Sequence, residues 1–276
     1  MSDKPADSPE KAASTPRKRK LAGEAKPAAK ADTKPAPAAS PSWFRKAMKW
    51  AGRSMKKALR WLGQGLKWVA AGYAVLILLF AFVPPPINLY QLGEAWRLGG
   101  ISKDWVGWDE IAPAMPRSVV AAEDANFCNH WGFDIAAIRE EIAEGGDKGR
   151  STLSQQMVKN VFLWHGRSYV RKAAEAMLTP VVELVWTKRR ILLIYLNTSE
   201  FAEGVFGVQA AAQHYFGVDA KDLSDVQAAR LAAILPDPKG RSASEPSSFV
   251  KKMARQHLAG AETIKADGRS ACFDSE

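Results

Sequence analysis

Apolar residues recur at helical spacing along most of the chain after residue 110, and no stretch alternates apolar and polar positions long enough to predict a strand. Pro180 is expected to kink one long helix. Two helices begin with capping-box pairs, Thr152 with Gln155 and Ser224 with Gln227. The pattern therefore predicts a mainly α domain. Its predicted helices cover residues 111–124, 135–144, 151–161, 170–196, 206–215, 224–235 and 249–265.

The first part of the chain has a different composition. Residues 1–42 are mostly Ala, Pro, Lys and Ser, and they hold too few large apolar side chains to form a core, so a disordered tail is predicted. Residues 43–67 interleave Trp, Phe, Met and Leu with Lys and Arg. This mixture is typical of a basic amphipathic juxtamembrane segment. A nucleic-acid-binding arm is the competing interpretation.

An uncharged apolar run follows this basic segment. Residues 68–83 carry no charge, and the uncharged stretch continues through three prolines to Gly93. A bilayer core needs about 20 apolar residues, so residues 68–86 are predicted to be a transmembrane signal anchor. No small-residue cleavage site follows. The Lys/Arg excess precedes the run, which places the N-terminus in the cytoplasm and residues from 87 onward in the periplasm of a bacterium, outside its inner membrane.

The net charge of +10 is unevenly distributed. Residues 1–67 contain 17 Lys/Arg and 5 Asp/Glu, a net +12, whereas the remainder has a net charge of −2. The basic character therefore belongs to the membrane-proximal part. With the anchor beside it, we expect a membrane surface as its partner and no nucleic acid.

The two cysteines, Cys128 and Cys272, do not have the spacing of a metal site. The compartment outside the cell permits a disulfide between them. However, Cys272 follows the last predicted helix, in what we expect to be a mobile tail. Two unpaired cysteines are therefore favoured over a bridge.

A first cluster of chemically useful residues lies in residues 121–134. Glu123, Asp124, His130 and Asp134 directly follow an apolar helix. Loss of solvation at such a position raises the pKa of a carboxyl group toward the range useful for proton transfer. From this stretch alone, a solvated acidic turn is an equally good interpretation.

A second cluster lies at the start of the helix predicted for residues 151–161. Ser151 and Thr152 offer hydroxyls where a helix N-terminus attracts anions. Gln156, Lys159 and Asn160 share one face of this helix. A capped surface helix is the alternative, but the polar cluster beside apolar neighbours favours a binding site.

Two further groups are ambiguous by themselves. Arg171 and Glu175 are four residues apart, as in an ordinary helical salt bridge. The run Lys188, Arg189 and Arg190 is interpreted as a solvated face, with a phosphate or headgroup contact as the alternative.

These pieces occur together in one order, and in that order the chain resembles the peptidoglycan glycosyltransferases of glycosyltransferase family 51. It is most similar to the monofunctional, biosynthetic members with a penicillin-binding-protein type transglycosylase domain, and the resemblance spans about residues 110–258. One position departs: Leu193 stands where many two-domain members carry Glu. The matching residues include Glu123, Asp124, Phe127, His130, Gly132, Phe133, Asp134, Gly149, Ser151, Thr152, Gln155, Gln156, Lys159, Asn160, Arg171, Lys172, Glu175, Lys188, Tyr195, Asn197, Gly204, Gly207 and Tyr215.

The resemblance implies a lysozyme-like, two-lobed helical domain at residues 87–265, followed by a tail at 266–276. It implies polymerisation of lipid II into β-1,4 glycan strands, with inversion and release of undecaprenyl diphosphate. The implied partners are lipid II, the growing lipid-linked glycan, the inner membrane, and other cell-wall synthesis and division proteins.

The resemblance also implies roles for the site residues. Glu123 is the expected base, and Glu175 orients Arg171 or holds a divalent cation, Mg or Mn, against the diphosphate. No other cofactor is expected. Phe127 is expected to shape the loop, and residues 162–164 to contact the bilayer or to belong to the core. The residues expected to bind substrate or support the site are Asp124, Phe127, His130, Ser151, Thr152, Gln156, Lys159, Asn160 and Arg171.

Two other functions are compatible with parts of the sequence. A lytic transglycosylase or lysozyme-like hydrolase needs one Glu such as Glu123, but it does not need Lys159, Arg171 and a second Glu. A non-enzymatic, membrane-tethered envelope scaffold explains residues 1–67 and leaves the outer polar clusters without a role.

Overall fold

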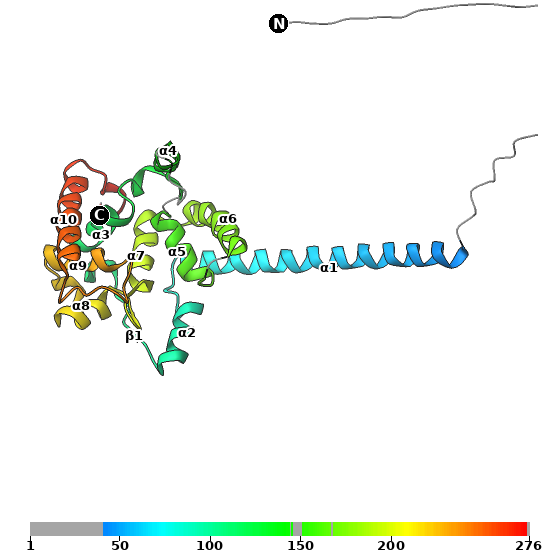
Figure 1. Cartoon of the computed structure of the whole chain (residues 1–276), viewed down its shortest axis with the longest axis horizontal. Helices are drawn as coiled ribbons and strands as arrows, with labels where there is room; N and C mark the ends of the chain where they lie inside the picture. Colours follow the sequence, from blue (N-terminus) through cyan, green and yellow to red (C-terminus); the bar gives the residue numbers. More distant parts are fainter. Residues whose placement is uncertain (1–40, 144, 146–150, 167, 275–276) are drawn as a thin grey trace, which may run out of the picture. The chain divides into compact units, whose positions relative to one another are not determined.

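The computed structural model describes residues 41–143, 145, 151–166 and 168–274. The tail expected at residues 1–42 lies almost entirely outside the described residues, as does Gly149 of the second motif. The described part is mainly helical, which confirms the predicted fold class (Figure 1). The helices are α1 (Ser42–Phe80), α2 (Leu89–Leu98), α3 (Ala114–Glu123), α4 (Ile135–Ala143), α5 (Leu153–Phe162), α6 (Tyr169–Val185), α7 (Lys188–Thr198), α8 (Val208–Phe216), α9 (Asp225–Ile234), α10 (Ser248–Ala266) and α11 (Ala271–Asp274).

Helix α1 joins two segments that the sequence pattern separates. It runs without a break from Ser42 to Phe80, so the basic residues 43–67 and the apolar residues after them form one helix. It also ends earlier than the predicted anchor at residue 86. Residues 84–86 are prolines, which lack the N–H that would extend the helix. Among the described residues, α1 is the one helix long and apolar enough to cross a membrane.

The last turns of α1 contact residues at and just before the start of α7. The Trp186 indole donates to the Ile77 carbonyl at 2.8 Å. The Arg190 guanidinium donates to the carbonyls of Phe80 and Val83, which lie at the helix end where carbonyls lack helical partners. The interpretation of residues 188–190 as a solvated face is therefore wrong for Arg190.

The residues after α5 belong to the core. Phe162 and Leu163 are buried, and the Phe162 ring lies against Tyr73 and Trp186. Trp164 is 43% exposed. Of the two alternatives left open for residues 162–164, the first two side chains therefore take the core position.

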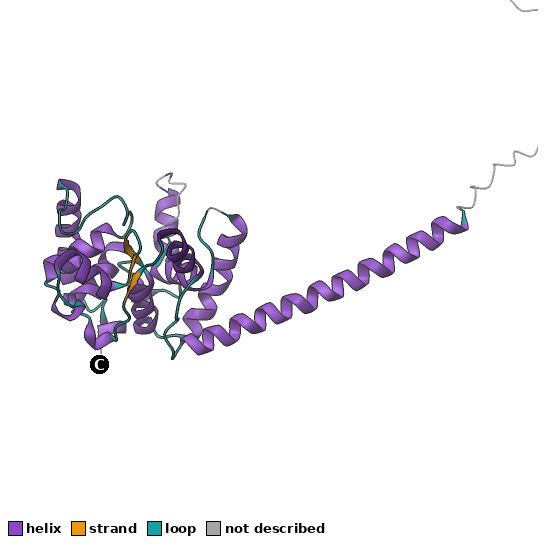
Figure 2. Ribbon diagram, turned by 90° about the horizontal axis from the view of Figure 1, so that it is seen from below, coloured by secondary structure: helices purple, strands orange, loops and turns teal. Residues whose placement is uncertain are grey.

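The helices form two packed groups. Helices α3, α9 and α10 pack on one another, and α5 packs against both α6 and α7 (Figure 1). A small sheet lies among the helices (Figure 2). Its strand order is β1-β3-β2, with β1 parallel and β2 antiparallel to β3. The strands, too short to show a two-residue period, are β1 (Ser102–Lys103), β2 (Glu200–Ala202) and β3 (Val205–Phe206). Short 3-10 turns are η1 (Trp108–Glu110), η2 (Phe127–Asn129) and η3 (Ala220–Asp222).

The helix predicted for residues 170–196 is two helices, and Pro180 is not where it breaks. Pro180 lies inside α6, which continues to Val185. The chain then leaves the helical conformation, and Thr187 caps α7 by accepting from the Arg190 N–H. The N-cap residue, with its extended backbone, separates the helices.

Helix α2 was not predicted. Asn88 caps it, because its side chain accepts from the Gln91 N–H at 2.8 Å and the Gln91 side chain accepts from the Asn88 N–H. The spacing of Asn88 and Gln91 is the sequence signal that could have found this helix.

Residues 266–274 do not form a free tail. Helix α10 extends to Ala266, Cys272 is bonded to Cys128, and Phe273 is fully buried. The expectation of two unpaired cysteines in this chain is therefore wrong. The pairing joins segments 144 residues apart in the sequence, where no local pattern could indicate it.

Candidate active site

Glu123 is the last residue of α3 and lines a cavity of about 290 Å³. Its Oε2 accepts a hydrogen bond from the Gln156 side-chain amide at 2.8 Å. Gln156 also lines a second cavity of about 330 Å³, together with Lys159 and Asn160. Glu123, the base expected from the sequence, and Lys159, the expected cation, thus line two cavities that adjoin at Gln156.

Tyr195 fixes the orientation of Gln156. Burial, and then the negative charge of Glu123, raise the pKa of Tyr195 well above its usual value, so its hydroxyl stays protonated and can donate. It contacts the Gln156 Oε1 atom at 3.2 Å. The Gln156 amide nitrogen must then point toward Glu123. A donor aimed at this carboxylate suits its ionised, proton-accepting form.

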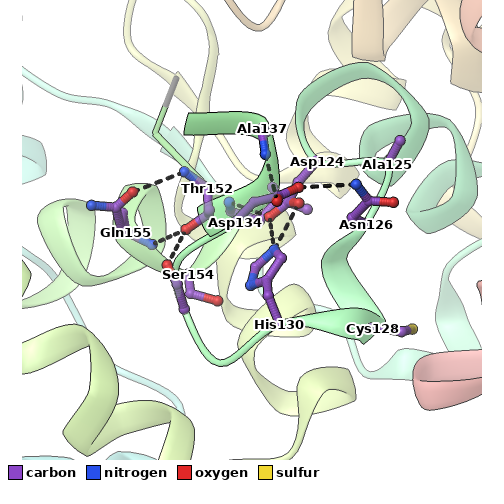
Figure 3. A network of polar contacts seen from close by, with 12 residues as sticks. Asp124, Ala125, Asn126, Cys128, His130, Asp134, Ala137, Thr152, Ser154 and Gln155 are labelled. Atoms are coloured by element: carbon purple, nitrogen blue, oxygen red, sulfur yellow. Dashed lines mark hydrogen bonds and ion pairs between the residues drawn. The ribbon is translucent and has the colours of Figure 1, made fainter. Parts of the chain in front are cut away.

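Asp124 ties the segment after Glu123 to the start of α5. Its carboxylate lies 2.9 Å from His130 Nε2 and accepts from the Leu153 N–H at 3.0 Å (Figure 3). The side chains of Asp124 and His130 are only 3% and 7% exposed. Both residues are therefore placed to hold the loop, and little of either is available to a substrate.

Asp134 closes the other end of this loop. One oxygen accepts from the Ala137 N–H at 2.9 Å and the other from the Asn126 side chain at 3.0 Å (Figure 3). The Ala137 amide first, and then Asn126, lower the pKa of Asp134. The carboxylate is therefore ionised at neutral pH and acts as a structural acceptor.

Phe127 is a core residue. It is fully buried, with its ring against Phe273 and the Lys188 ammonium 4.4 Å from the ring centroid. Since no part of its side chain is accessible, the assignment of Phe127 as a substrate-binding residue is corrected. It shapes the loop from inside the fold.

Thr152 begins α5 with the predicted capping box, which is confirmed. Its hydroxyl accepts from the Gln155 N–H and donates to the Gly132 carbonyl at 2.7 Å (Figure 3). Gly132 has φ of 84°, and a Cβ there would meet the Thr179 side chain. The buried Thr152 hydroxyl thus holds the loop and the helix start together, which leaves it little capacity for a substrate.

Helix α6 contributes charges beside this helix start. Arg171 Nη1 pairs with Glu175 at 2.7 Å, so the predicted i, i+4 ion pair is confirmed. Lys172 pairs with the other Glu175 oxygen and donates to the Ser151 hydroxyl at 3.0 Å. Glu175 is buried and holds both cations, and Lys172 reaches Ser151, which lines the Glu123 cavity.

Lys159 differs from Arg171 and Lys172, which both pair with Glu175. In the described ranges of the chain, its ammonium forms no ion pair, although it lines the larger cavity. Burial lowers the pKa of Lys159 from its usual value, and Glu175 partly counteracts this. A partly desolvated cation that faces a cavity is suited to an anionic ligand.

Lys188 supports the loop through contacts of its mostly covered ammonium group. Its ammonium donates to the His130 carbonyl at 2.7 Å and pairs with Glu183 at 2.8 Å, and Ser154 donates to the same carboxylate. The Lys188 side chain is 14% exposed. The solvated-face interpretation is therefore wrong for Lys188 as well.

Comparison with known proteins identifies the family. A family model described as Transglycosylase matches residues 93–261, more than half of the chain. The chain belongs to the transglycosylase family. The resemblance inferred from the motifs is thereby confirmed.

Several curated relatives of this transglycosylase carry one description, biosynthetic peptidoglycan transglycosylase. The protein from Jannaschia sp. (strain CCS1) is 60% identical over 199 residues, which cover 72% of this chain and 83% of that protein. The one from Pseudomonas putida (strain W619) is 48% identical over 195 residues, covering 67% and 83%. The one from Caulobacter vibrioides is 44% identical over 208 residues, covering 74% and 91%.

The donor set near Glu175 does not fit a resident divalent cation. Both Glu175 oxygens are already engaged by Arg171 and Lys172. Among the described residues, no group of three His, Cys, Asp or Glu side chains comes together as metal ligands. A hard cation prefers several oxygen ligands, and here its nearest neighbours would be two cationic side chains.

Four residues that line this transglycosylase's larger cavity were not predicted as site residues: Tyr90, His165, Glu200 and Lys239. His165 stacks on Tyr90 with 3.9 Å between ring centroids, and burial, followed by the charge of Lys159, lowers the pKa of His165 to about 4. Glu200 accepts from the Tyr90 hydroxyl at 2.6 Å, and Lys239 lines the same wall. These residues come from separate segments, so no local spacing connects them.

Proposed function

We propose that this chain polymerises lipid II into glycan strands, with Glu123 as the base and Lys159 as the principal cation at the leaving diphosphate. Membership of the transglycosylase family and the shared description of the relatives support peptidoglycan synthesis. The observation that carries the residue roles is the pair of adjoining cavities, one lined by Glu123 and one by Lys159, with Gln156 in both.

The first chemical requirement is activation of the acceptor. A sugar hydroxyl is a weak nucleophile, so a carboxylate that removes its proton during attack lowers the barrier. Glu123 takes this proton as the acceptor oxygen attacks the anomeric carbon of the donor. The Gln156 amide, held by Tyr195, keeps the Glu123 carboxylate oriented. Direct attack on an α-linked donor gives the β product with inversion.

The second requirement is stabilisation of the departing diphosphate. Cations and hydrogen-bond donors that are already oriented contribute more there than they would in water. Lys159 supplies a charge without a competing carboxylate partner among the described residues, and Asn160 adds an amide in the same cavity. Arg171 and Lys172, both held by Glu175, extend the positive region toward Ser151. We propose this positioning role for Glu175 and derive no step through a metal ion.

We also propose an inner-membrane location with the N-terminus in the cytoplasm and the catalytic domain in the periplasm. The apolar helix α1 and the positive charge of residues 1–67 support this orientation. The disulfide between Cys128 and Cys272 supports it independently, because such bonds persist in oxidising compartments. There the enzyme meets lipid II and the growing glycan, and we expect it to act beside other cell-wall synthesis and division proteins.

The test is a polymerisation assay with the full-length protein in detergent. Supplied with lipid II, it should produce glycan strands, and moenomycin should inhibit it. Finished murein is the matched control substrate and should stay intact. Soluble muropeptides from murein, with lipid II left unused, would favour a murein-cleaving enzyme. Failure to act on either substrate would favour the scaffold function.

A further inference from the structure

The last residues of the chain are attached to the segment that carries the proposed base. Cys128 lies five positions after Glu123, in η2, and is bonded to Cys272 in α11, with 5.6 Å between their Cα atoms. Figure 3 shows Cys128 on the same segment as Asp124, Asn126 and His130. A covalent bond thus joins the C-terminal segment to the proposed catalytic loop.

Two polar contacts accompany this bond. Arg269 Nη1 donates to the Ala125 carbonyl at 3.3 Å, two residues after Glu123. Asp274 pairs with Arg117 at 2.7 Å, and Arg117 lies on α3, the helix that ends at Glu123. The C-terminal segment therefore holds the chain both before and after the proposed base.

Phe273 anchors the same segment in the core. It is fully buried, and its ring centroid lies 6.4 Å from those of Trp108 and Phe127. Phe127 in turn packs against the His130 ring. Phe273, which follows Cys272, therefore packs against Phe127 of the loop that also contains Asp124 and His130.

We propose that residues 269–274, here named the C-terminal clip, position Glu123 for proton transfer. The proposal rests on the role of Glu123 given above. The base must lie within hydrogen-bond distance of the acceptor hydroxyl, and α3 ends at Glu123, so helical hydrogen bonds do not continue through the loop. The clip adds a covalent constraint to those that Gln156 and Asp124 supply. Arg269, Cys272 and Asp274 are thus positioning residues that act through the loop and do not touch substrate.

The clip should affect turnover more than substrate binding. Lys159 and Asn160 lie on α5 and line the larger cavity, whereas none of the clip residues lines either cavity that adjoins at Gln156. A displacement of the base lowers the rate of the chemical step. The expected signature of a broken clip is therefore a lower kcat with little change in KM for lipid II.

The test uses the full-length enzyme and its variant C128S/C272S, each with and without a phosphine reductant. Both are assayed with lipid II at a temperature where circular dichroism shows them fully folded. We expect kcat to fall about tenfold in C128S/C272S, with KM within about twofold. Reductant should bring the wild type to the same level and leave C128S/C272S unchanged, which is the matched control for side effects of the reductant.

Three outcomes would overturn the positioning role. These are wild-type kcat in the folded C128S/C272S protein, a change in KM with constant kcat, and an activity loss that merely follows the unfolded fraction. If C128S/C272S does not fold, Arg269→Gln serves instead, because it removes the contact to Ala125 and keeps the disulfide. It should lower kcat by a smaller factor, and an unchanged kcat would overturn the proposal. An inactive wild type would instead contradict the proposed function.

Discussion

The loop that carries the proposed base and the helices that carry the cations are held by different kinds of contact. In the loop, Asp124 binds both His130 and the start of α5, and a disulfide fixes Cys128. On the cation side, Lys159 has no ion pair within the described chain, and Arg171 is held through Glu175 on its own helix. The loop is constrained by long-range contacts and the cations mainly by local ones.

The proposed base and the cations differ in how accurately each must be placed. Proton transfer needs a heavy-atom distance of about 2.6–3.2 Å, so a small displacement of a base is costly. Coulombic stabilisation falls only as the inverse of distance, so a cation tolerates more movement. The molecule places its long-range bonds where the chemistry requires the more accurate distance.

The largest predicted effect comes from removing the buried support of the loop. Lys188→Met leaves the Glu183 carboxylate buried without its cation and removes a donor to the His130 carbonyl. Breaking a buried pair in this way costs about 3–5 kcal/mol of unfolding free energy. Chemical unfolding followed by circular dichroism measures it. The matched double variant E183Q/K188M also removes the charge of the Glu183 carboxylate and should recover much of the lost stability. If Lys188→Met lowered the unfolding free energy by only about a few tenths of a kcal/mol, the loop would not depend on this pair.

The next effect is on the cation side. Lys159→Met should lower kcat about 10²–10³-fold, because it removes a preorganised charge from the leaving group. Lys159→Arg keeps the charge and should retain most of the activity. Both variants should keep wild-type stability, since Lys159 has no ion pair in the described part to lose. Near-normal lipid II turnover by Lys159→Met would exclude it as the principal cation.

The pH dependence of the rate tests the cation side through the ionisation of Lys159. Burial lowers the pKa of Lys159, so its charge is present below that pKa and is lost as the pH rises through it. The rate should therefore fall on the alkaline side, by about tenfold per pH unit, at a lower pH than an ordinary lysine with pKa 10.5 would give. A profile of kcat/KM against pH measures this limb. In Lys159→Arg the limb should disappear, and an identical limb in both proteins would assign it to another group.

The smallest predicted effect concerns the start of α5. Thr152→Ala removes the cap and the donor to the Gly132 carbonyl, so the unfolding free energy should fall by about 1 kcal/mol. Thr152→Ser retains the hydroxyl and should restore most of it. Thermal unfolding of the two variants provides the comparison. Equal stability of Ala and Ser at this position would mean that the capping hydroxyl contributes nothing measurable.

Features that depend on neighbours in the sequence were predictable. The capping boxes at Thr152 and Ser224 and the Arg171–Glu175 pair rest on residues three or four positions apart, and all three are present. The mainly helical fold follows from the same local period. Glu123 and Lys159 could be proposed as site residues because each stands in a motif of its own.

Features that depend on distant segments were not predictable. The pairing of Cys128 with Cys272 and the contact of Lys188 with the His130 carbonyl arise only when separate segments pack. The burial of Phe127 was not predictable either, because an aromatic side chain at this position is compatible with both a core residue and a binding residue. The spacing of residues in the sequence cannot decide between these roles, because it does not show which side of the loop other segments cover.

The central claim is that Glu123 removes the acceptor proton, and the most direct measurement is the lipid II turnover of Glu123→Gln beside the wild type. Gln is nearly the same size and its amide oxygen can still accept the bond from Gln156, so the fold should persist. The account predicts a fall in kcat of about 10³-fold with nearly unchanged KM and unfolding temperature. Turnover within about threefold of the wild type would contradict it.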